Sequence, residues 1–276
     1  MASTATTEKV ETFRTLHKPG APFIIANAWD AGSARILEGL GFPALATTSS
    51  GFALTLGRRD YGVTREEALA HGRLLASAVD IPVSADLENG FGVSPEDAAE
   101  TIRMAAGAGL AGGSIEDSSG EDGAPIIGKK LAVERIAAAA EAARDAKDGF
   151  VLTARAEGFL HGQGDLKEVI ERLQAFGEAG ADILFAPGLP DLEAVKAVCS
   201  SVGKPVNVLI YGGLARCSLE ELAEAGAARL SLGGGLAFSA YGALAESASA
   251  ILKDGRFDAL ASHAEGAKTA RGFLRS

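Results

Sequence analysis

Cysteine is scarce in this sequence. Among 276 residues only Cys199 and Cys217 occur, and they form neither a CxxC pair nor another spacing typical of a metal site. This spacing gives no indication of a cysteine-ligated metal centre. So few cysteines are also typical of proteins in a reducing compartment, and we expect a cytoplasmic location.

Positive charge and long apolar runs are lacking too. The net charge is −10, the pI is about 5.0, and no stripe of Lys and Arg occurs anywhere. Nucleic-acid binding needs clustered basic side chains, so nucleic acid is excluded as a partner. Residues 1–9 are polar, and no apolar run reaches the roughly 18 residues that cross a bilayer. We therefore expect a soluble protein without a membrane partner.

What the sequence does have is a regular alternation of short apolar runs and amphipathic segments. The apolar runs are continuous, as in parallel strands that are covered on both faces. The predicted strands are 23–27, 44–48, 82–86, 112–116, 150–155, 182–186, 205–210 and 229–232. The predicted helices are 8–17, 33–40, 65–78, 95–108, 133–146, 166–176, 192–202 and 219–225.

Eight strand–helix units in this length predict an α/β fold of the (β/α)8 TIM-barrel type. A doubly wound open sheet is the competing interpretation, but eight evenly spaced units leave none for a switch point. We expect one domain over residues 1–276, with 237–276 as a C-terminal helical extension. Two further helices, 237–252 and 257–273, are predicted in addition to the eight helices already assigned. The last is therefore expected to pack on a neighbouring subunit.

Charged side chains follow several of the predicted strands. Asp86 ends one strand and Glu88 lies two residues on, so that both would point to the same face of a strand. Glu116 and Arg155 end two others, and active sites of TIM barrels lie at these strand ends. The three acids offer only oxygen and have no histidine beside them, which favours Mg²⁺ or Mn²⁺ over Zn²⁺. Barrel-top salt bridges are the alternative.

Other strand ends carry neutral polar groups. Thr48, Ser49, Ser50 and Gly51 offer hydroxyl and backbone N–H donors to a carboxylate or phosphonate, although such a run also occurs in ordinary loops. Asn207 lies within the seventh predicted strand. We expect these residues to contact a substrate.

Five segments in order resemble the isocitrate lyase/phosphoenolpyruvate mutase superfamily. They are Asn27-Ala28-Trp29-Asp30-Ala31, Gly57-Arg58-Arg59-Asp60, Asp86-Leu87-Glu88, Ser114-Ile115-Glu116-Asp117 and Ala154-Arg155-Ala156-Glu157. The resemblance implies a (β/α)8 barrel whose C-terminal helix is swapped between the subunits of a homodimer or homotetramer.

The resemblance also implies roles for individual residues. Asp86, Glu88 and Glu116 match the Mg²⁺ ligands, several of them through water. Arg155 matches the group that binds the anionic end of a substrate, and Asp60 matches an acid near the metal. Arg155, Asp60 and Glu116 are the expected catalytic residues, and Trp29 and Asp86 join the expected substrate contacts.

One loop departs from the lyase pattern. Lyases of the superfamily carry a Lys-Lys/Arg-Cys-Gly-His segment after the Glu-Asp pair, whereas residues 118–130 contain neither Cys nor His. Lys129 and Lys130 lie at its end and are expected to be solvated. Pro187-Gly188 also stands where lyases have an acidic residue.

These features predict a Mg²⁺-dependent enzyme that acts on a small 2-oxo acid or its enolate. Carbon–carbon cleavage by a lyase or decarboxylase is favoured, since decarboxylation needs no cysteine acid. Carbon–phosphorus mutase or hydrolase chemistry on phosphonopyruvate-like substrates is one alternative. A barrel that binds 2-oxo acids without turnover is another.

Overall fold

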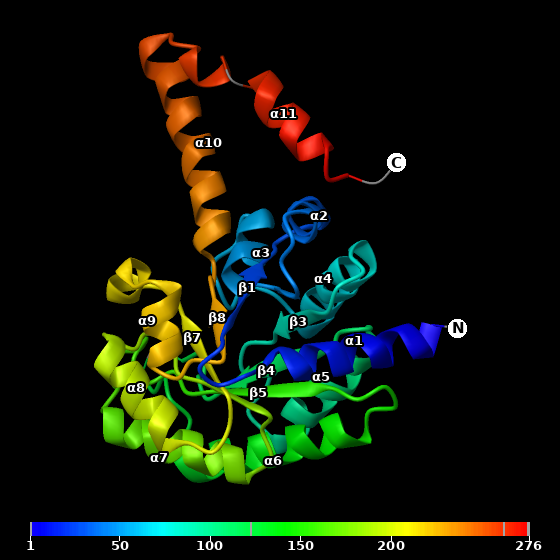
Figure 1. Cartoon of the computed structure of the whole chain (residues 1–276), viewed down its shortest axis with the longest axis vertical. Coiled ribbons are helices and arrows are strands. Elements are labelled where there is room, and N and C mark those ends of the chain that lie inside the picture. Colours follow the sequence, from blue (N-terminus) through cyan, green and yellow to red (C-terminus); the bar gives the residue numbers. More distant parts are fainter. Residues whose placement is uncertain (1, 122, 262, 275–276) are drawn as a thin grey trace.

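Eight parallel strands close into a barrel in the computed structural model, which describes residues 2–121, 123–261 and 263–274 (Figure 1). Each strand pairs with its neighbours in sequence, and β1 pairs with β8 to close the ring. The predicted fold class is confirmed. The strands are β1 Phe23–Asn27, β2 Leu45–Ala46, β3 Val83–Asp86, β4 Gly112–Glu116, β5 Val151–Arg155, β6 Ile183–Phe185, β7 Val206–Leu209 and β8 Arg229–Ser231.

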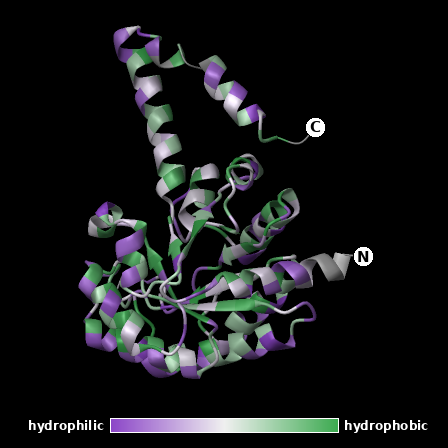
Figure 2. Ribbon diagram, in the orientation of Figure 1, coloured by the Kyte–Doolittle hydropathy of each residue, from purple (hydrophilic) through white to green (hydrophobic). Residues whose placement is uncertain are grey.

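Helices surround the barrel, and Figure 2 shows their hydrophilic residues outside the apolar strands. In chain order the helices are α1 Ala2–Leu16, α2 Ala31–Gly39, α3 Ser49–Thr55, α4 Arg65–Ala78, α5 Pro95–Gly107, α6 Lys129–Asp145, α7 Leu166–Glu178, α8 Leu192–Ser201, α9 Leu219–Glu224, α10 Gly235–Asp254 and α11 His263–Arg271, of which α10 and α11 extend beyond the barrel. The sequence did not predict α3, because Thr48 to Gly51 were interpreted as a donor loop. The predicted helix 257–273 is broken into the 3₁₀ turn Asp258–Leu260 and α11.

Local sequence explains where these helices begin and end. In α4 the Thr64 side chain accepts from the Glu67 N–H, and the Glu67 side chain accepts in return. Such a capping box satisfies donors that the first helical turn leaves free. The turn after α9 passes through Gly226 with φ +96°, a conformation that glycine adopts without strain.

The N-terminal end of the barrel is sealed by α1. Val10 and Phe13 of α1 are fully buried against Ile25, Val151 and Ile183, which lie on β1, β5 and β6. This apolar plug closes one end of the barrel. A cavity inside the strands can therefore open only at the other end.

The chain beyond β8 leaves the barrel. Figure 1 shows α10 projecting away from it, with α11 turning back from its far end. Apolar side chains on this extension are exposed, including Leu244, Leu252 and Phe257. Near the C-terminus, the Phe273 ring lies against Gly39 of α2, where an added Cβ would stand 2.1 Å from the ring. No described helix combines the length and apolar character needed to cross a membrane.

Candidate active site

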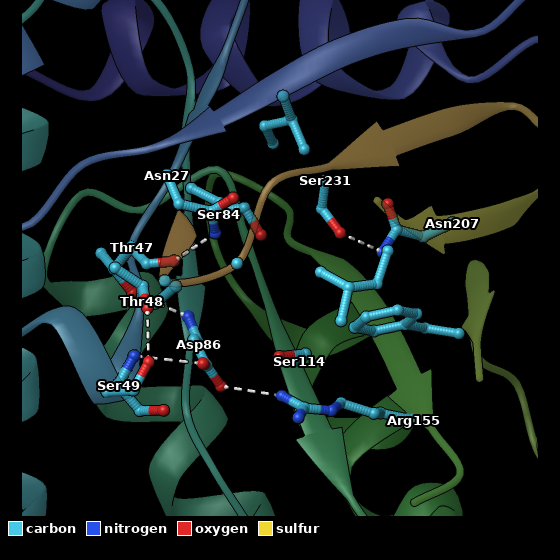
Figure 3. Close-up of a pocket in the computed structure, with 18 of the residues that line it drawn as sticks. Asn27, Thr47, Thr48, Ser49, Ser84, Asp86, Ser114, Arg155, Asn207 and Ser231 are labelled. Carbon is cyan, nitrogen blue, oxygen red and sulfur yellow. Dashed lines mark hydrogen bonds and ion pairs between the residues drawn. The ribbon is translucent and has the colours of Figure 1, made fainter. Parts of the chain in front are cut away.

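A cavity of about 190 Å³ opens at the C-terminal ends of the strands and continues into the barrel (Figure 3). Of the residues that the sequence singled out, seven line it. They are Thr48, Ser49, Ser50, Asp60, Asp86, Arg155 and Asn207. Polar groups from separate strands therefore meet in one space, as the strand-end argument predicted.

Arg155, at the end of β5, is the centre of the rim. Its guanidinium pairs with Asp86 at 3.4 Å and Glu116 at 3.2 Å, and its Nε donates to Glu157. The guanidinium also lies 5.3 Å from the centre of the Phe185 ring. Burial by itself opposes the charge, but these carboxylates outweigh it and hold the pKa of Arg155 well above its usual value. Arg155 is therefore a permanent cation in a fixed orientation.

Asp86 connects the end of β3 to the segment before α3. Its carboxylate accepts from the Ser49 N–H at 3.1 Å, and its own N–H donates to the Thr47 hydroxyl at 2.8 Å. The Thr48 hydroxyl accepts from the Gly51 N–H and caps α3. The predicted donor run is thus the first turn of a helix, and one of its N–H groups already holds Asp86.

Glu88 reaches the site differently from the prediction. β3 ends at Asp86, and Glu88 lies in the following turn with φ +48°, so the two side chains do not share a strand face. The Glu88 Oε1 is buried and has no hydrogen-bond partner. Burial, together with the charges of Asp86 and Asp60, raises the pKa of Glu88 to about 8. Burial and Asp86 raise the pKa of Asp60 as well.

The loop after Glu88 is held from below by Arg135 of α6. Arg135 is 1% exposed, and its guanidinium donates to the carbonyls of Gly92 at 2.6 Å, Ser94 at 3.3 Å and Asn89. A buried arginine that bonds only to backbone oxygens in this way fixes the path of the turn that carries Glu88.

The residues present fit a hydrated divalent cation. In the described part of the chain, no three His, Cys, Asp or Glu side chains stand close enough to ligate a metal directly. The unpartnered oxygen of Glu88 and the raised pKa values of Glu88 and Asp60 nevertheless indicate unbalanced negative charge near Asp86. Mg²⁺ retains several waters when bound, so these oxygens can hold it partly through water.

Tyr61 is a site residue that the sequence did not reveal. Its hydroxyl donates to Glu116, which is 3% exposed. Burial raises the pKa of Glu116 well above its usual value, against the opposing charge of Arg155. Tyr61 has φ +60°, unusual for a bulky side chain, and this turn points the ring at Glu116.

Several predicted residues lie outside the cavity wall. Trp29 is half-buried, and its carbonyl is hydrogen-bonded to the His71 ring. Gly51 is buried where an added Cβ would meet Thr48 and Ala237. Lys129 pairs with Glu171 of α7 at 3.3 Å, and this agrees with an outward position.

The cavity is also lined by residues to which the sequence analysis assigned no role. Small polar side chains line it from three strands, namely Ser84 of β3, Ser114 of β4 and Ser231 at the end of β8, and Arg229 lines it from the first position of β8. The sequence did carry one signal for these residues, a polar residue at every second position of an otherwise apolar strand. Side chains two apart point to the same face of a strand, but the bounds of the strand must be known before that face can be assigned to the barrel interior.

Comparisons with known proteins agree with this geometry. The family described as phosphoenolpyruvate phosphomutase matches residues 13–252. The 2-methylisocitrate lyase of Escherichia coli (strain K12) is 30% identical over 234 residues, which cover 78% of each chain.

Two solved structures are similar over nearly their whole length. A protein of Burkholderia cenocepacia J2315 designated a lyase/mutase has 48% identity and a TM-score of 0.93, covering 98% of this chain and 97% of that chain. Oxaloacetate acetylhydrolase in complex with the inhibitor 3,3-difluorooxalacetate has 25% identity and a TM-score of 0.80, covering 90% and 88%.

The closed barrel, its arginine–carboxylate rim and these likenesses define a lyase- or mutase-type barrel enzyme. The chain belongs to the phosphoenolpyruvate phosphomutase family, within the phosphoenolpyruvate mutase/isocitrate lyase superfamily. The resemblance read from the five sequence segments is confirmed, and the protein is a lyase-like enzyme.

Proposed function

We propose that this protein is a cytoplasmic, Mg²⁺-dependent enzyme that cleaves a carbon–carbon bond in a small 2-oxo acid. The observation that carries the proposal is Arg155, which stands at the mouth of the cavity between Asp86 and Glu116. A fixed cation beside oxygen ligands suits a substrate that is an anion and becomes an enolate. The free thiols of Cys199 and Cys217 agree with a reducing compartment.

In this proposal Arg155 binds the substrate carboxylate and faces the C2 oxygen. When a carbon–carbon bond at C3 breaks, its electron pair forms the C2–C3 double bond of an enolate, and Arg155 stabilises the enolate oxygen. The leaving carbon departs as CO₂, or as a carbonyl compound whose hydroxyl proton passes to a rim carboxylate. Asp86, Glu88 and Glu116 would hold Mg²⁺, which supplies Lewis-acid activation of the substrate oxygens when bound. The small volume of the cavity limits the substrate to a few carbons.

Cleavage of a carbon–carbon bond is favoured over carbon–phosphorus chemistry by the named relatives. The Escherichia coli relative is a 2-methylisocitrate lyase, and the solved acetylhydrolase acts on oxaloacetate, as its name states. The family description, phosphoenolpyruvate phosphomutase, supports the second candidate, rearrangement of a phosphonate. The two candidate reactions predict different ligand preferences, since carbon–carbon cleavage requires a cavity that prefers a carboxylic acid and the rearrangement requires one that prefers a phosphonate.

Calorimetric titration tests the proposal. Pyruvate, oxaloacetate, 2-oxoglutarate and phosphonopyruvate are each titrated with and without Mg²⁺, and any ligand that binds is then assayed for turnover. We expect Mg²⁺-dependent binding of a carboxylic acid and release of a smaller 2-oxo acid. Tighter binding of phosphonopyruvate would favour the mutase candidate, and binding without turnover would make the protein a 2-oxo acid binder. Absence of all binding would contradict the enolate mechanism.

We also propose that α10 and α11 are exchanged between the subunits of a homodimer or homotetramer. The exposed apolar side chains of Leu244, Leu252 and Phe257 support this assembly. If α11 is exchanged, Phe273 of one subunit would contact Gly39 of the partner subunit instead of its own Gly39. Removal of residues 257–276 should therefore lower the molar mass of the assembly in light scattering. An unchanged state of association would argue against exchange.

A further inference from the structure

The floor of the cavity carries a second arginine. Arg229 is the first residue of β8, is 5% exposed, and lines the cavity, with its guanidinium next to His17 at the end sealed by α1. Its Nε donates to Asn207 Oδ1 at 2.9 Å, one terminal nitrogen donates to His17 Nε2 at 3.2 Å, and the other donates to Thr153 Oγ1 at 3.2 Å. All three partners are neutral acceptors.

Arg229 has no counter-ion among the described residues. The buried Arg135 lacks one as well, but its guanidinium is held by backbone carbonyls and does not line the cavity. Arg155 is matched by three carboxylates, and Arg172 of α7 pairs with Asp117 and Glu168. Among the described residues, no carboxylate forms an ion pair with Arg229. Burial lowers the pKa of Arg229 to about 9, so the group is still a cation at neutral pH. A buried charge without a partner is costly, and an anion at the floor would relieve that cost.

The barrel leaves a path from the rim to this cation. TIM-barrel interiors are usually filled by layers of bulky branched side chains. Here the small side chains of Ser84, Ser114 and Ser231 line the cavity instead, and Figure 3 shows all three around it. Asn207 donates to Ser231 Oγ at 2.9 Å, so its amide is fixed between the wall and Arg229.

The two arginines stand at different depths. Thr153, which accepts from Arg229, precedes Arg155 by two residues on β5. At about 3.3 Å per residue, Thr153 lies roughly 7 Å before Arg155 along β5. The Arg229 guanidinium, 3.2 Å from the Thr153 hydroxyl, is therefore farther from the rim than Arg155. A short carbon chain with an acidic group at each end matches two cations arranged in this way.

We propose that Arg229 forms a second anion subsite, on the cavity floor, which holds the distal carboxylate of a 2-oxo dicarboxylic acid. This inference rests on the proposed function and narrows its substrate class. A carboxylate held by Arg229 remains ionised and leaves with its own fragment. The fragment that carries it must therefore leave without the electron pair of the broken bond. This balances for a diacid with a hydroxyl group on C4: that hydroxyl gives its proton to a rim carboxylate and becomes a carbonyl while the C3–C4 electron pair forms the enolate. The distal fragment is then released as an oxo acid, not as CO₂.

A matched pair of ligands tests the subsite. 2-Oxoglutarate and 2-oxovalerate have the same chain and differ only in a terminal carboxylate or methyl group. With Mg²⁺ present, calorimetry on the full-length protein should show that 2-oxoglutarate binds roughly ten- to a hundredfold more tightly, as expected for hydrogen bonds to a charged group. Arg229→Gln should bring the ratio near one while 2-oxovalerate binds as before. Arg229→Lys should restore part of the preference.

The outcomes separate this inference from the proposed function. Equal Mg²⁺-dependent binding of both acids to the wild-type protein would overturn the subsite and leave the function standing. A preference that depends on Arg229 but not on Mg²⁺ would support the subsite and contradict the metal mechanism. A purely structural Arg229 predicts an equal loss for both acids. Should Arg229→Gln fail to fold, a crystal structure with 2-oxoglutarate decides: a distal carboxylate away from Arg229 refutes the subsite.

Discussion

Acid should destabilise the folded protein through His17, which follows α1 at the sealed end of the barrel. Its Nδ1 lies 2.8 Å from the Phe13 carbonyl and its Nε2 accepts from Arg229. Arg229 has only donors, so the ring is neutral, with its proton on Nδ1. Burial, and then the charge of Arg229, lowers the pKa of His17 to about 3.

The size of the effect follows from the two pKa values. Unfolding restores the pKa of His17 to about 6.5, so between pH 6.5 and 3 the unfolded chain carries a proton there that the folded chain does not. Stability that is present above pH 6.5 is therefore lost as the pH falls. Between pH 7 and pH 5 the loss amounts to about 2 kcal/mol in the free energy of unfolding.

Urea unfolding of the wild-type protein and of His17→Gln at pH 7, 6 and 5 measures this loss. Other groups also titrate, and Glu88 with a pKa near 8 and Asp117 with a pKa near 6 favour the folded state in acid. They are present in both proteins, so the difference between the two pH dependences isolates His17. The reasoning is refuted if wild type and His17→Gln lose the same free energy between pH 7 and pH 5.

Three further substitutions test the support of the site. In urea unfolding, Arg135→Met should lower the free energy of unfolding by roughly 3 kcal/mol or more, because the buried carbonyls of the loop after β3 lose their donors. The control Arg103→Met breaks only exposed ion pairs and should lower it by less than about 1 kcal/mol. Gly51→Ala should cost about 1–3 kcal/mol in thermal unfolding, since the new Cβ would stand 2.5 Å from a neighbouring side chain. Asp86→Asn should weaken Mg²⁺ binding at least roughly tenfold in calorimetry, while Glu134→Gln, on the exposed face of α6, should not.

Most of the barrel could be predicted from the sequence because its signals are local. Parallel strands covered on both faces are continuous apolar runs, so the predicted 112–116 coincides with β4. Capping residues mark helix starts equally well, and α4 lies at the predicted 65–78. Helix α3 was missed because it is one short segment whose cap, Thr48, also suits a loop.

The site was predictable to the extent that it follows strand ends. Arg155 and Glu116 are the last residues of β5 and β4, and the ladder pairs them directly. Glu88 was predicted on a strand face, but the strand stops at Asp86, and the turn that carries Glu88 depends on Arg135 from α6. Tyr61 could not be predicted at all. Its contact with Glu116 joins residues 55 positions apart, and it depends on a positive φ at Tyr61 that the sequence does not reveal.

The unpaired charge of Arg229 is tolerated because the surrounding dipoles are oriented toward it. Asn207 turns its carbonyl oxygen to the guanidinium and its amide to Ser231, and neutral His17 offers a lone pair from below. These dipoles stabilise a cation without neutralising it, so its charge still acts on the space above. A carboxylate partner from the protein would have stabilised Arg229 more and cancelled that charge. The arrangement is therefore better suited to an anion that arrives from the cavity than to permanent structural pairing.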